Sequence, residues 1–171
     1  MLHRKFLYLH KQVNLRTMEN IYKERIESLR AVMERNGWDA VVVSGSDPHS
    51  SEYPAPRWQQ VKFLSGFTGE AGDLVVTMDH AGLWTDSRYF IQAVTQLEGT
   101  GVELHKTRVP GAVGIPQWLS DKARTVALDG LCWNVDAVKE IAGALGEGGL
   151  VVDVPDMLED LWTSRPQIPM T

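Results

Sequence analysis

The sequence contains a single cysteine, Cys132, among its 171 residues. One cysteine excludes an internal disulfide framework and any zinc site built on paired cysteines, and it fits a reducing compartment. We expect Cys132, which lies in a Leu-Cys-Trp stretch beside a strand-like run, to be a buried structural thiol. The sequence also lacks an apolar run of the roughly 18–20 residues that cross a bilayer. We therefore expect a cytoplasmic protein with no membrane partner.

Basic side chains are in deficit, since 17 Lys and Arg stand against 22 Asp and Glu, for a net charge of −5. Residues 1–17 hold four basic residues and no acid, so residues 18–171 carry −9. The four are Arg4, Lys5, Lys11 and Arg16. Nucleic-acid backbones are bound by clustered Lys and Arg, so we expect no nucleic-acid partner. We expect residues 1–17 to be a disordered basic extension, because they show neither apolar periodicity nor a signal-peptide cleavage site.

Apolar runs typical of strands alternate with amphipathic segments typical of helices along residues 18–163. We expect strands over 40–43, 74–78, 83–84, 102–106, 125–129 and 150–154. We expect helices over 18–36, 89–97, 115–123 and 135–145, and a helical turn over 156–162. This order predicts one α/β domain of three layers, with a β-sheet between helices, and the turn at 79–82 predicts a hairpin that makes the sheet mixed. Residues 164–171, rich in proline, are expected to be a linker toward a second domain.

The polar loop 47–53 (DPHSSEY) follows the first expected strand. In open α/β sheets, ligand-binding loops gather at the carboxyl ends of strands. Asp47, His49 and Glu52 are close in sequence, but their spacing defines no face and no second histidine cluster completes a shell, so a metal site is the weakest interpretation. Two others stay open: a loop held by its own side-chain hydrogen bonds, and a loop whose His49, Glu52 and Tyr53 line a cleft.

Three glycines and acidic Glu70 mark the next stretch, residues 66–72. A phosphate-binding loop follows a strand, opens a helix and ends in Gly-Lys-Ser/Thr. This loop precedes an expected strand, lacks that ending, and carries a carboxylate that would repel a phosphate. We therefore exclude a nucleotide site. We expect the glycines to permit positive φ in a tight loop, with Phe67 filling its centre.

A strand ends and a helix begins within residues 83–90 (LWTDSRYF). Asp86 or Ser87 is the expected helix cap, which would place Arg88 in the first helical turn. A cation there is unfavourable against the helix dipole, so Arg88 needs a partner. The planar guanidinium suits a carboxylate or carbonyl. A structural ion pair with Asp86 and a contact with substrate from outside the domain both remain open.

The remaining histidines, His3, His10, His80 and His105, are scattered through the sequence, and we expect surface or turn roles for them. We expect packing roles for Trp118, Trp133 and Trp162 at helix and strand positions.

Four ordered motifs give the chain a family resemblance. They are DPHSSEY at 47–53, FLSGFTGEAG at 63–72, DHAGLWTDSRYF at 79–90 and LWTSRP at 161–166. Together they resemble the first domain of the three-domain, cytosolic type of aminopeptidase P, over nearly the whole chain. Ser87 stands where that family usually has glycine, and residues 70–73 (EAGD) differ from its common SAGT.

The resemblance implies an enzyme that removes the N-terminal residue preceding proline. Family members use two divalent metal ions, usually manganese, held by two Asp, one His and two Glu of a C-terminal domain, so the resemblance implies no catalytic residue and no metal ligand in this chain. It implies a creatinase/prolidase N-terminal fold with ribonuclease H-like topology. It also implies that Arg88 contacts the bound X-Pro peptide. The expected cleft residues are His49, Glu52, Tyr53, Phe67, Asp86 and Tyr89.

The same resemblance predicts further partners, namely the second and catalytic domains of the same polypeptide and a second copy in a homodimer. The accessory, peptide-binding domain of a proline-specific metallopeptidase is the first hypothesis. The alternative is a non-catalytic, peptidase-like module that binds protein, as in a histone chaperone of this family. A nuclease would need carboxylates converging on magnesium and a basic groove, and the charge of −9 argues against the groove. Metal ligands after residue 171 would distinguish the first two.

Overall fold

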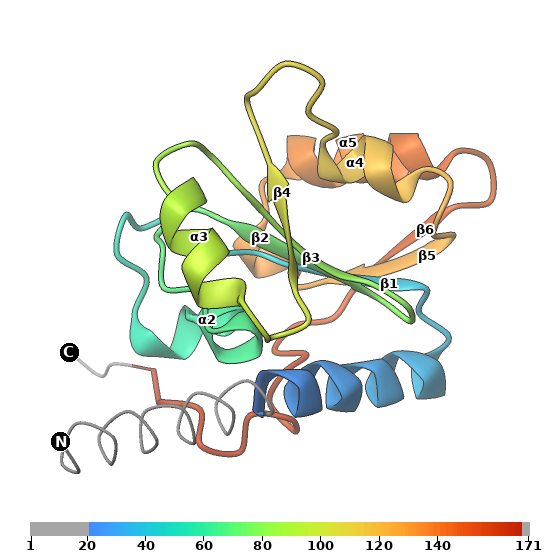
Figure 1. The fold of residues 1–171 in the computed structure, drawn as a ribbon. Coiled ribbons are helices and arrows are strands. Elements are labelled where there is room, and N and C mark those ends of the chain that lie inside the picture. The colour runs from blue at the N-terminus through green and yellow to red at the C-terminus, as the bar shows by residue number, and fades with distance from the viewer. Residues whose placement is uncertain (1–20, 169–171) are drawn as a thin grey trace, which may run out of the picture.

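Six strands and the helices on both of their faces make up the part of the chain that the structure, a computed structural model, describes, residues 21–168 (Figure 1). The strands are β1 (Ala40–Val43), β2 (Asp73–Thr77), β3 (Ala81–Thr85), β4 (Glu103–Lys106), β5 (Thr125–Leu128) and β6 (Leu150–Asp153). After an N-terminal helix, described over 21–36, come α2 (Gln60–Ser65), α3 (Phe90–Leu97), α4 (Ile115–Leu119) and α5 (Val135–Leu145). Short 3₁₀ turns, η1 and η2, cover Pro56–Trp58 and Gly130–Cys132. The expected extension 1–17 and the expected helix start at Met18 lie outside the described residues.

The strands form one sheet in the order β4-β3-β2-β1-β5-β6. β2 is antiparallel to both of its neighbours, and the pairs β1–β5, β5–β6 and β3–β4 are parallel. The predicted mixed sheet and its β2–β3 hairpin are therefore confirmed. The expected turn over 79–82 extends too far along the chain, because Ala81 and Gly82 already belong to β3 and pair with β2.

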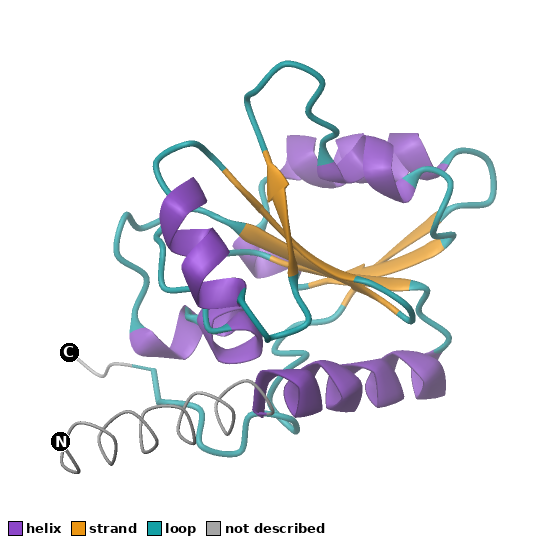
Figure 2. Ribbon diagram, in the orientation of Figure 1, coloured by secondary structure: helices purple, strands orange, loops and turns teal. Residues whose placement is uncertain are grey.

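Helices cover the two faces of this sheet, which confirms the three-layer α/β architecture (Figure 2). The N-terminal helix, α2 and α3 pack on one face, and α4 and α5 on the other. Successive side chains of a strand point to opposite faces, so Val41 and Val43 join the first core, and Ala40 and Val42 the second. Because both faces are covered, β1 is apolar throughout and buried at all four positions.

The structure differs from the expected elements in three places. Residues 60–65, for which no helix is expected, form α2, whose six residues are too few for a visible periodicity. The helix expected over 115–123 ends at Leu119, and residues 156–162 form turns rather than a helix. Within residues 21–168, no helix is long and apolar enough to cross a membrane.

Five of the six strands end at one edge of the sheet, because β2 alone runs in the opposite direction. We call this the carboxyl edge. The segments that meet there are 44–55, 66–72, 86–89, 107–114 and 129–134. It therefore gathers the loops that the sequence analysis singled out.

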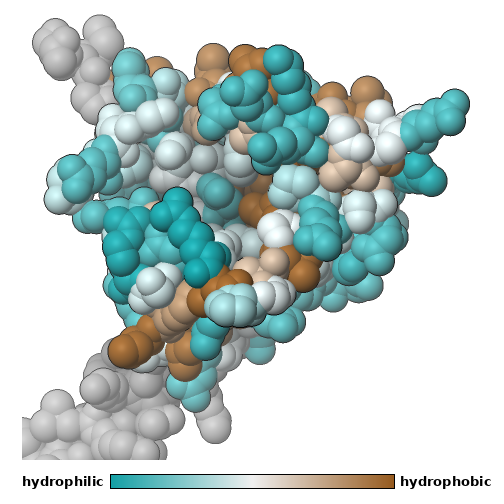
Figure 3. Space-filling model, turned by 90° about the horizontal axis from the view of Figure 1, so that it is seen from above, coloured by the Kyte–Doolittle hydropathy of each residue, from teal (hydrophilic) through white to brown (hydrophobic). Residues whose placement is uncertain are grey.

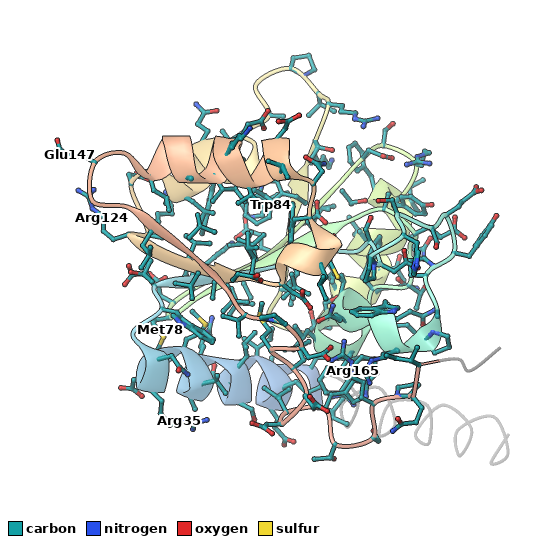
Figure 4. The ribbon with its side chains drawn as sticks, turned by 180° about the vertical axis from the view of Figure 1, so that it is seen from behind. Arg35, Met78, Trp84, Arg124, Glu147 and Arg165 are labelled. Carbon is teal, nitrogen blue, oxygen red and sulfur yellow. The ribbon has the colours of Figure 1, made fainter. Side chains whose placement is uncertain are left out.

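Two ion pairs hold the C-terminal segment on the domain, and Figure 4 labels one of their residues, Arg165. Arg165 donates through Nε to the carbonyl of Arg57 at 3.1 Å, and its Nη1 lies 2.8 Å from Asp156 Oδ1. Arg57 Nη2 contacts the other oxygen of Asp156 at 3.1 Å. Both arginines are buried. Although we expected a linker from residue 164, the packed part of the domain includes Arg165.

Candidate functional site

Loop 44–53 of the carboxyl edge is folded around one buried carboxylate. Oδ1 of Asp47 accepts hydrogen bonds from the backbone N–H groups of His49 and Ser51 at 3.0 and 2.9 Å. Burial acts to raise the pKa of Asp47, but the hydrogen bonds from Ser51 and His49 outweigh it and hold that pKa below its usual value. The structure thus contains the self-bonded loop that the sequence left as one alternative.

The side chains of His49, Glu52 and Tyr53 point outward from this loop and are exposed. Tyr53 lines a small cleft with Trp58, Phe67 and Glu70, whereas His49 and Glu52 line neither this cleft nor the larger one described below. Of these three exposed side chains, Tyr53 alone lies at one of the two clefts.

Phe67 fills the centre of the glycine-rich loop and is buried. Its ring packs edge-on against Tyr89 at 5.9 Å between centroids, and the Tyr89 hydroxyl lies 3.4 Å from Glu70 Oε2. Of the glycines in this loop, only Gly66 has the positive φ that we expected of all of them. Gly69 is needed because any side chain there would collide with Phe67.

Arg88 lies in the turn before α3, not in the first turn of the helix. The helix begins at Phe90, after Tyr89, and no side chain caps it. The expected cap at Asp86 or Ser87 is therefore wrong. Arg88 also lies outside the first helical turn, so the unfavourable effect of the helix dipole expected for its charge does not apply. The reason is that the Asp86 carboxylate is already bonded to Arg88, through its backbone N–H at 3.1 Å and through its guanidinium.

The ion pair between Asp86 and Arg88 is bidentate. Arg88 Nε lies 2.9 Å from Asp86 Oδ1, and Nη2 lies 2.8 Å from Oδ2. The aspartate side chain is 12% exposed and the arginine side chain 65% exposed. The Arg88 hydrogen bonds and charge outweigh burial and lower the pKa of Asp86, so the pair is ionised at neutral pH. The guanidinium is thereby held in place through Nε and Nη2, and its Nη1 donates no hydrogen bond within residues 21–168.

A guanidinium has five N–H donors, and Asp86 takes up two of them. Among residues 21–168, Asp86 is the only acceptor for the Arg88 side chain. Its other donors therefore face solvent at the carboxyl edge, where they can bind a carbonyl or a carboxylate.

A larger cleft, of about 310 Å³, lies between the carboxyl edge and α5. Asp86 forms part of its wall, together with Asp73, Trp84, Arg108 and Glu140. Asp73 accepts a hydrogen bond from the backbone N–H of Gly45 at 3.1 Å, and burial raises its pKa despite that bond. Figure 3 views the molecule from the side of α4 and α5, where the surface is mostly hydrophilic with scattered hydrophobic patches.

Sequence reasoning missed Asp73 and Arg108 in this cleft. Asp73 is part of the departure from the family pattern at residues 70–73, which was the available signal. Arg108 has a φ of 57°, unusual for a residue with a side chain, and nothing in the sequence marks it.

No three His, Cys, Asp or Glu side chains of residues 21–168 converge at the carboxyl edge. The described residues of this edge therefore do not form a metal centre. What they offer is a fixed cation, Arg88, beside clefts that carry carboxylates.

Comparison with known proteins identifies the domain. The Creatinase/Prolidase N-terminal domain family model matches residues 25–161. Aminopeptidase P2 of Arabidopsis thaliana is 30% identical over 168 residues, which cover 93% of this chain and 24% of that protein. A probable Xaa-Pro aminopeptidase P of Pyricularia oryzae is 37% identical over 157 residues, covering 86% of this chain and 25% of that protein. The chain thus spans about a quarter of the length of these relatives.

Solved structures give the same assignment. The X-prolyl aminopeptidase of Caenorhabditis elegans, described as a cytosolic enzyme with a di-nuclear active site, has a TM-score of 0.78 and 32% identity, covering 86% of this chain and 26% of that one. The N-terminal domain of the cytoplasmic peptidase PepQ from Mycobacterium tuberculosis has a TM-score of 0.58 and 27% identity, covering 81% of this chain and 98% of that one. The chain therefore belongs to the creatinase/prolidase N-terminal domain family.

Proposed function

We propose that this chain acts as the N-terminal, peptide-binding and assembly domain of a metal-dependent Xaa-Pro aminopeptidase in the cytoplasm. The named relatives support this activity, and the chain corresponds to about a quarter of each of them. In this proposal the catalytic residues and two divalent ions, manganese by preference, belong to a further domain. The present domain contributes a contact to the peptide and a surface for the other domains.

The observation that carries the proposal is the guanidinium of Arg88, which uses two of its five N–H donors to bind Asp86. An exposed arginine ordinarily loses side-chain entropy when it binds a ligand. Asp86 has already restricted Arg88 through two hydrogen bonds, so less entropy remains to be lost. The unused donors can then bind the backbone carbonyl or a carboxylate of a peptide with charge-assisted hydrogen bonds.

The test is substitution of Arg88 in the full-length aminopeptidase. Arg88→Ala should lower kcat/KM about 10- to 100-fold, which corresponds to about 1.4–2.7 kcal/mol and to the loss of a charge-assisted hydrogen bond. Arg88→Lys should recover only part of the activity, because an ammonium lacks the planar fork. The free energy of unfolding should fall only slightly, because Arg88 is exposed and an exposed ion pair contributes little to stability.

Arg35 provides the matched control, because it is an exposed arginine near the end of the N-terminal helix, away from the carboxyl edge (Figure 4). Arg35→Ala should leave kcat/KM unchanged. A purely structural role for Arg88 gives the opposite pattern, with a destabilised domain and normal kinetics in the folded fraction. That pattern would remove Arg88 from the site.

A further inference from the structure

Three side chains with metal-binding atoms meet where the β2–β3 turn lies beside the outermost strand β4. This place is toward the end of the sheet opposite the carboxyl edge. His80 ends the turn before β3, and Glu103 and His105 stand two residues apart on the edge strand β4, so they share one face. One donor atom from each side chain lies within 4.8 Å of the other two. Among residues 21–168 this is the only such group of three.

The two imidazoles are already spaced for a shared ion. His80 Nε2 lies 3.0 Å from His105 Nε2. Zinc–nitrogen bonds of about 2.0–2.1 Å place two ligands of a tetrahedral ion about 3.3 Å apart, only a few tenths of an ångström more. The Glu103 side chain is 69% exposed, and Glu103 Oε2 lies 3.8 Å from His80 Nδ1. A carboxylate oxygen of Glu103 thus lies within 4.8 Å of a ring nitrogen of each histidine and is the third candidate ligand.

Gly82 leaves room for the two histidine nitrogens to come together. Gly82 pairs with Glu103 across the β3–β4 ladder. A Cβ at position 82 would lie 2.8 Å from Nε2 of both histidines, closer than a real contact allows. The two ring nitrogens therefore meet over a position that only glycine leaves open.

Aromatic side chains fix the orientation of both imidazoles. The His105 ring stacks on Trp84 with 3.8 Å between centroids and 9° between planes. Trp118 of α4 packs against both histidines, with centroid distances of 5.0 Å to His80 and 5.9 Å to His105. Rings held in this way lose little freedom when an ion binds them, which favours affinity.

The backbone of His80 is also fixed, by its own turn. Its N–H donates to Thr77 Oγ1 at 3.0 Å, and its carbonyl accepts from the Thr77 N–H at 2.8 Å. Thr77 Oγ1 in turn donates to Asp79 Oδ1 at 2.8 Å. One ligand is thus anchored by the hairpin and the other two by the edge strand.

We infer that His80, Glu103 and His105 bind one divalent ion of the zinc class, which links the β2–β3 turn to the edge strand β4. Two imidazoles and one carboxylate suit Zn²⁺, Co²⁺, Ni²⁺ or Cu²⁺ better than Mg²⁺ or Mn²⁺. Three protein ligands leave a fourth position for water. The site is separate from the proposed peptide contact and does not depend on it.

The test is titration of the chelator-treated 171-residue chain with ZnCl₂ by calorimetry. We expect one ion per chain at this site and a higher thermal midpoint in its presence, since a ligand that binds the folded state stabilises it. His105→Gln should weaken zinc binding at least about 100-fold, because changes to groups behind the ligands alone cost 10- to 100-fold. Glu103→Gln, at an exposed position that the fold does not need, should weaken it at least about 10-fold. Co²⁺ should give the visible absorption of a four-coordinate complex in the wild-type chain and not in His105→Gln.

The other histidines of the sequence serve as controls. His49→Gln and the double variant His3→Gln/His10→Gln should bind zinc as the wild-type chain does. Zinc binding that survives both His105→Gln and Glu103→Gln would overturn the inference, as would loss of binding in the controls alone. A wild-type chain that binds no more zinc than His105→Gln would mean that the histidines form only a hydrogen bond with each other. If His105→Gln does not fold, Glu103→Gln alone decides.

Discussion

Asp47 illustrates how one side chain can determine a loop. Its Oδ1 accepts hydrogen bonds from the backbone N–H groups of His49 and Ser51 in loop 44–53. The sequence placed Asp47 in the right loop and offered self-bonding as an alternative. It could not choose, because the choice depends on burial of the carboxylate, which the rest of the fold creates.

Asp47→Ala should lower the free energy of unfolding by about 2 kcal/mol at pH 7, within the 1.5–3 kcal/mol of hydrogen bonds to a charged group. Because the pKa of Asp47 is lowered in the folded state, its contribution is present above the unfolded pKa of about 3.9 and is lost as the pH falls through the folded value. Urea unfolding of both proteins at pH 7 and at about pH 3 should therefore show a gap that narrows in acid. A gap of equal size at both pH values would mean that the charge of Asp47 contributes nothing.

The buried thiol of Cys132 should be nearly inert in the folded protein. Burial of the thiol, and to a smaller extent the nearby Asp129 carboxylate, raises the pKa of Cys132 to about 12. The residue is 7% exposed. Since the thiolate is the reactive species, iodoacetamide should alkylate the folded chain at least about 100-fold more slowly than the urea-unfolded chain at pH 8. Equal rates would show that the segment 130–132 opens readily.

At the scale of elements, the sequence identified what is long or strictly patterned. The amphipathic helix α5 was predicted with the bounds that the structure shows, and β1 was recognised from four consecutive apolar residues. The six-residue α2 was missed because it is too short to show a period. The start of α3 was placed too early because Asp86 looks like a cap in sequence but is bonded to Arg88 in space.

Helix α5 depends on a side-chain cap that can be tested. Asn134 Oδ1 accepts a hydrogen bond from the Ala137 N–H at 2.8 Å. Asn134→Ala should destabilise the domain by about 1 kcal/mol, whereas Asn134→Asp should retain most of the stability, because aspartate caps as well as asparagine. Urea unfolding of the three proteins measures both differences. An unchanged midpoint for Asn134→Ala would show that the tertiary contacts of α5 alone hold its first turn.

At the scale of the whole molecule, ion pairs join the C-terminal segment to η1. Asp156 lies between the buried side chains of Arg57 and Arg165, which come from distant parts of the sequence. No local pattern announces such a contact, so the sequence suggested a linker for a segment whose Arg165 is packed.

Asp156→Asn should cost about 3 kcal/mol, because it leaves two buried cations without their counter-ion. Asp121→Asn is the control, since Asp121 pairs with Lys122 at the surface and an exposed pair is worth at most about 1 kcal/mol. Thermal or urea unfolding of both variants gives the comparison. Losses of similar size would mean that the pairs around Asp156 are screened as surface pairs are.

The 171-residue chain with Mn²⁺ should not hydrolyse an X-Pro peptide, because no cluster of metal ligands forms beside Arg88 among its described residues. The assay compares the purified chain with a metal-only blank. Turnover that persists after further purification would contradict the assignment of catalysis to another domain.

The position of β1 in the centre of the sheet has a consequence for the order of folding. β1 pairs on one side with β2, Ala40 opposite Thr77, and on the other with β5, Ala40 opposite Val126. The strands β1 to β4 are adjacent in sequence order, so their pairing closes shorter loops than the pairing of β1 with β5. During synthesis on the ribosome, this half of the sheet can form while β1 still has an open side, and β5 and β6 then complete it as the last strands to dock.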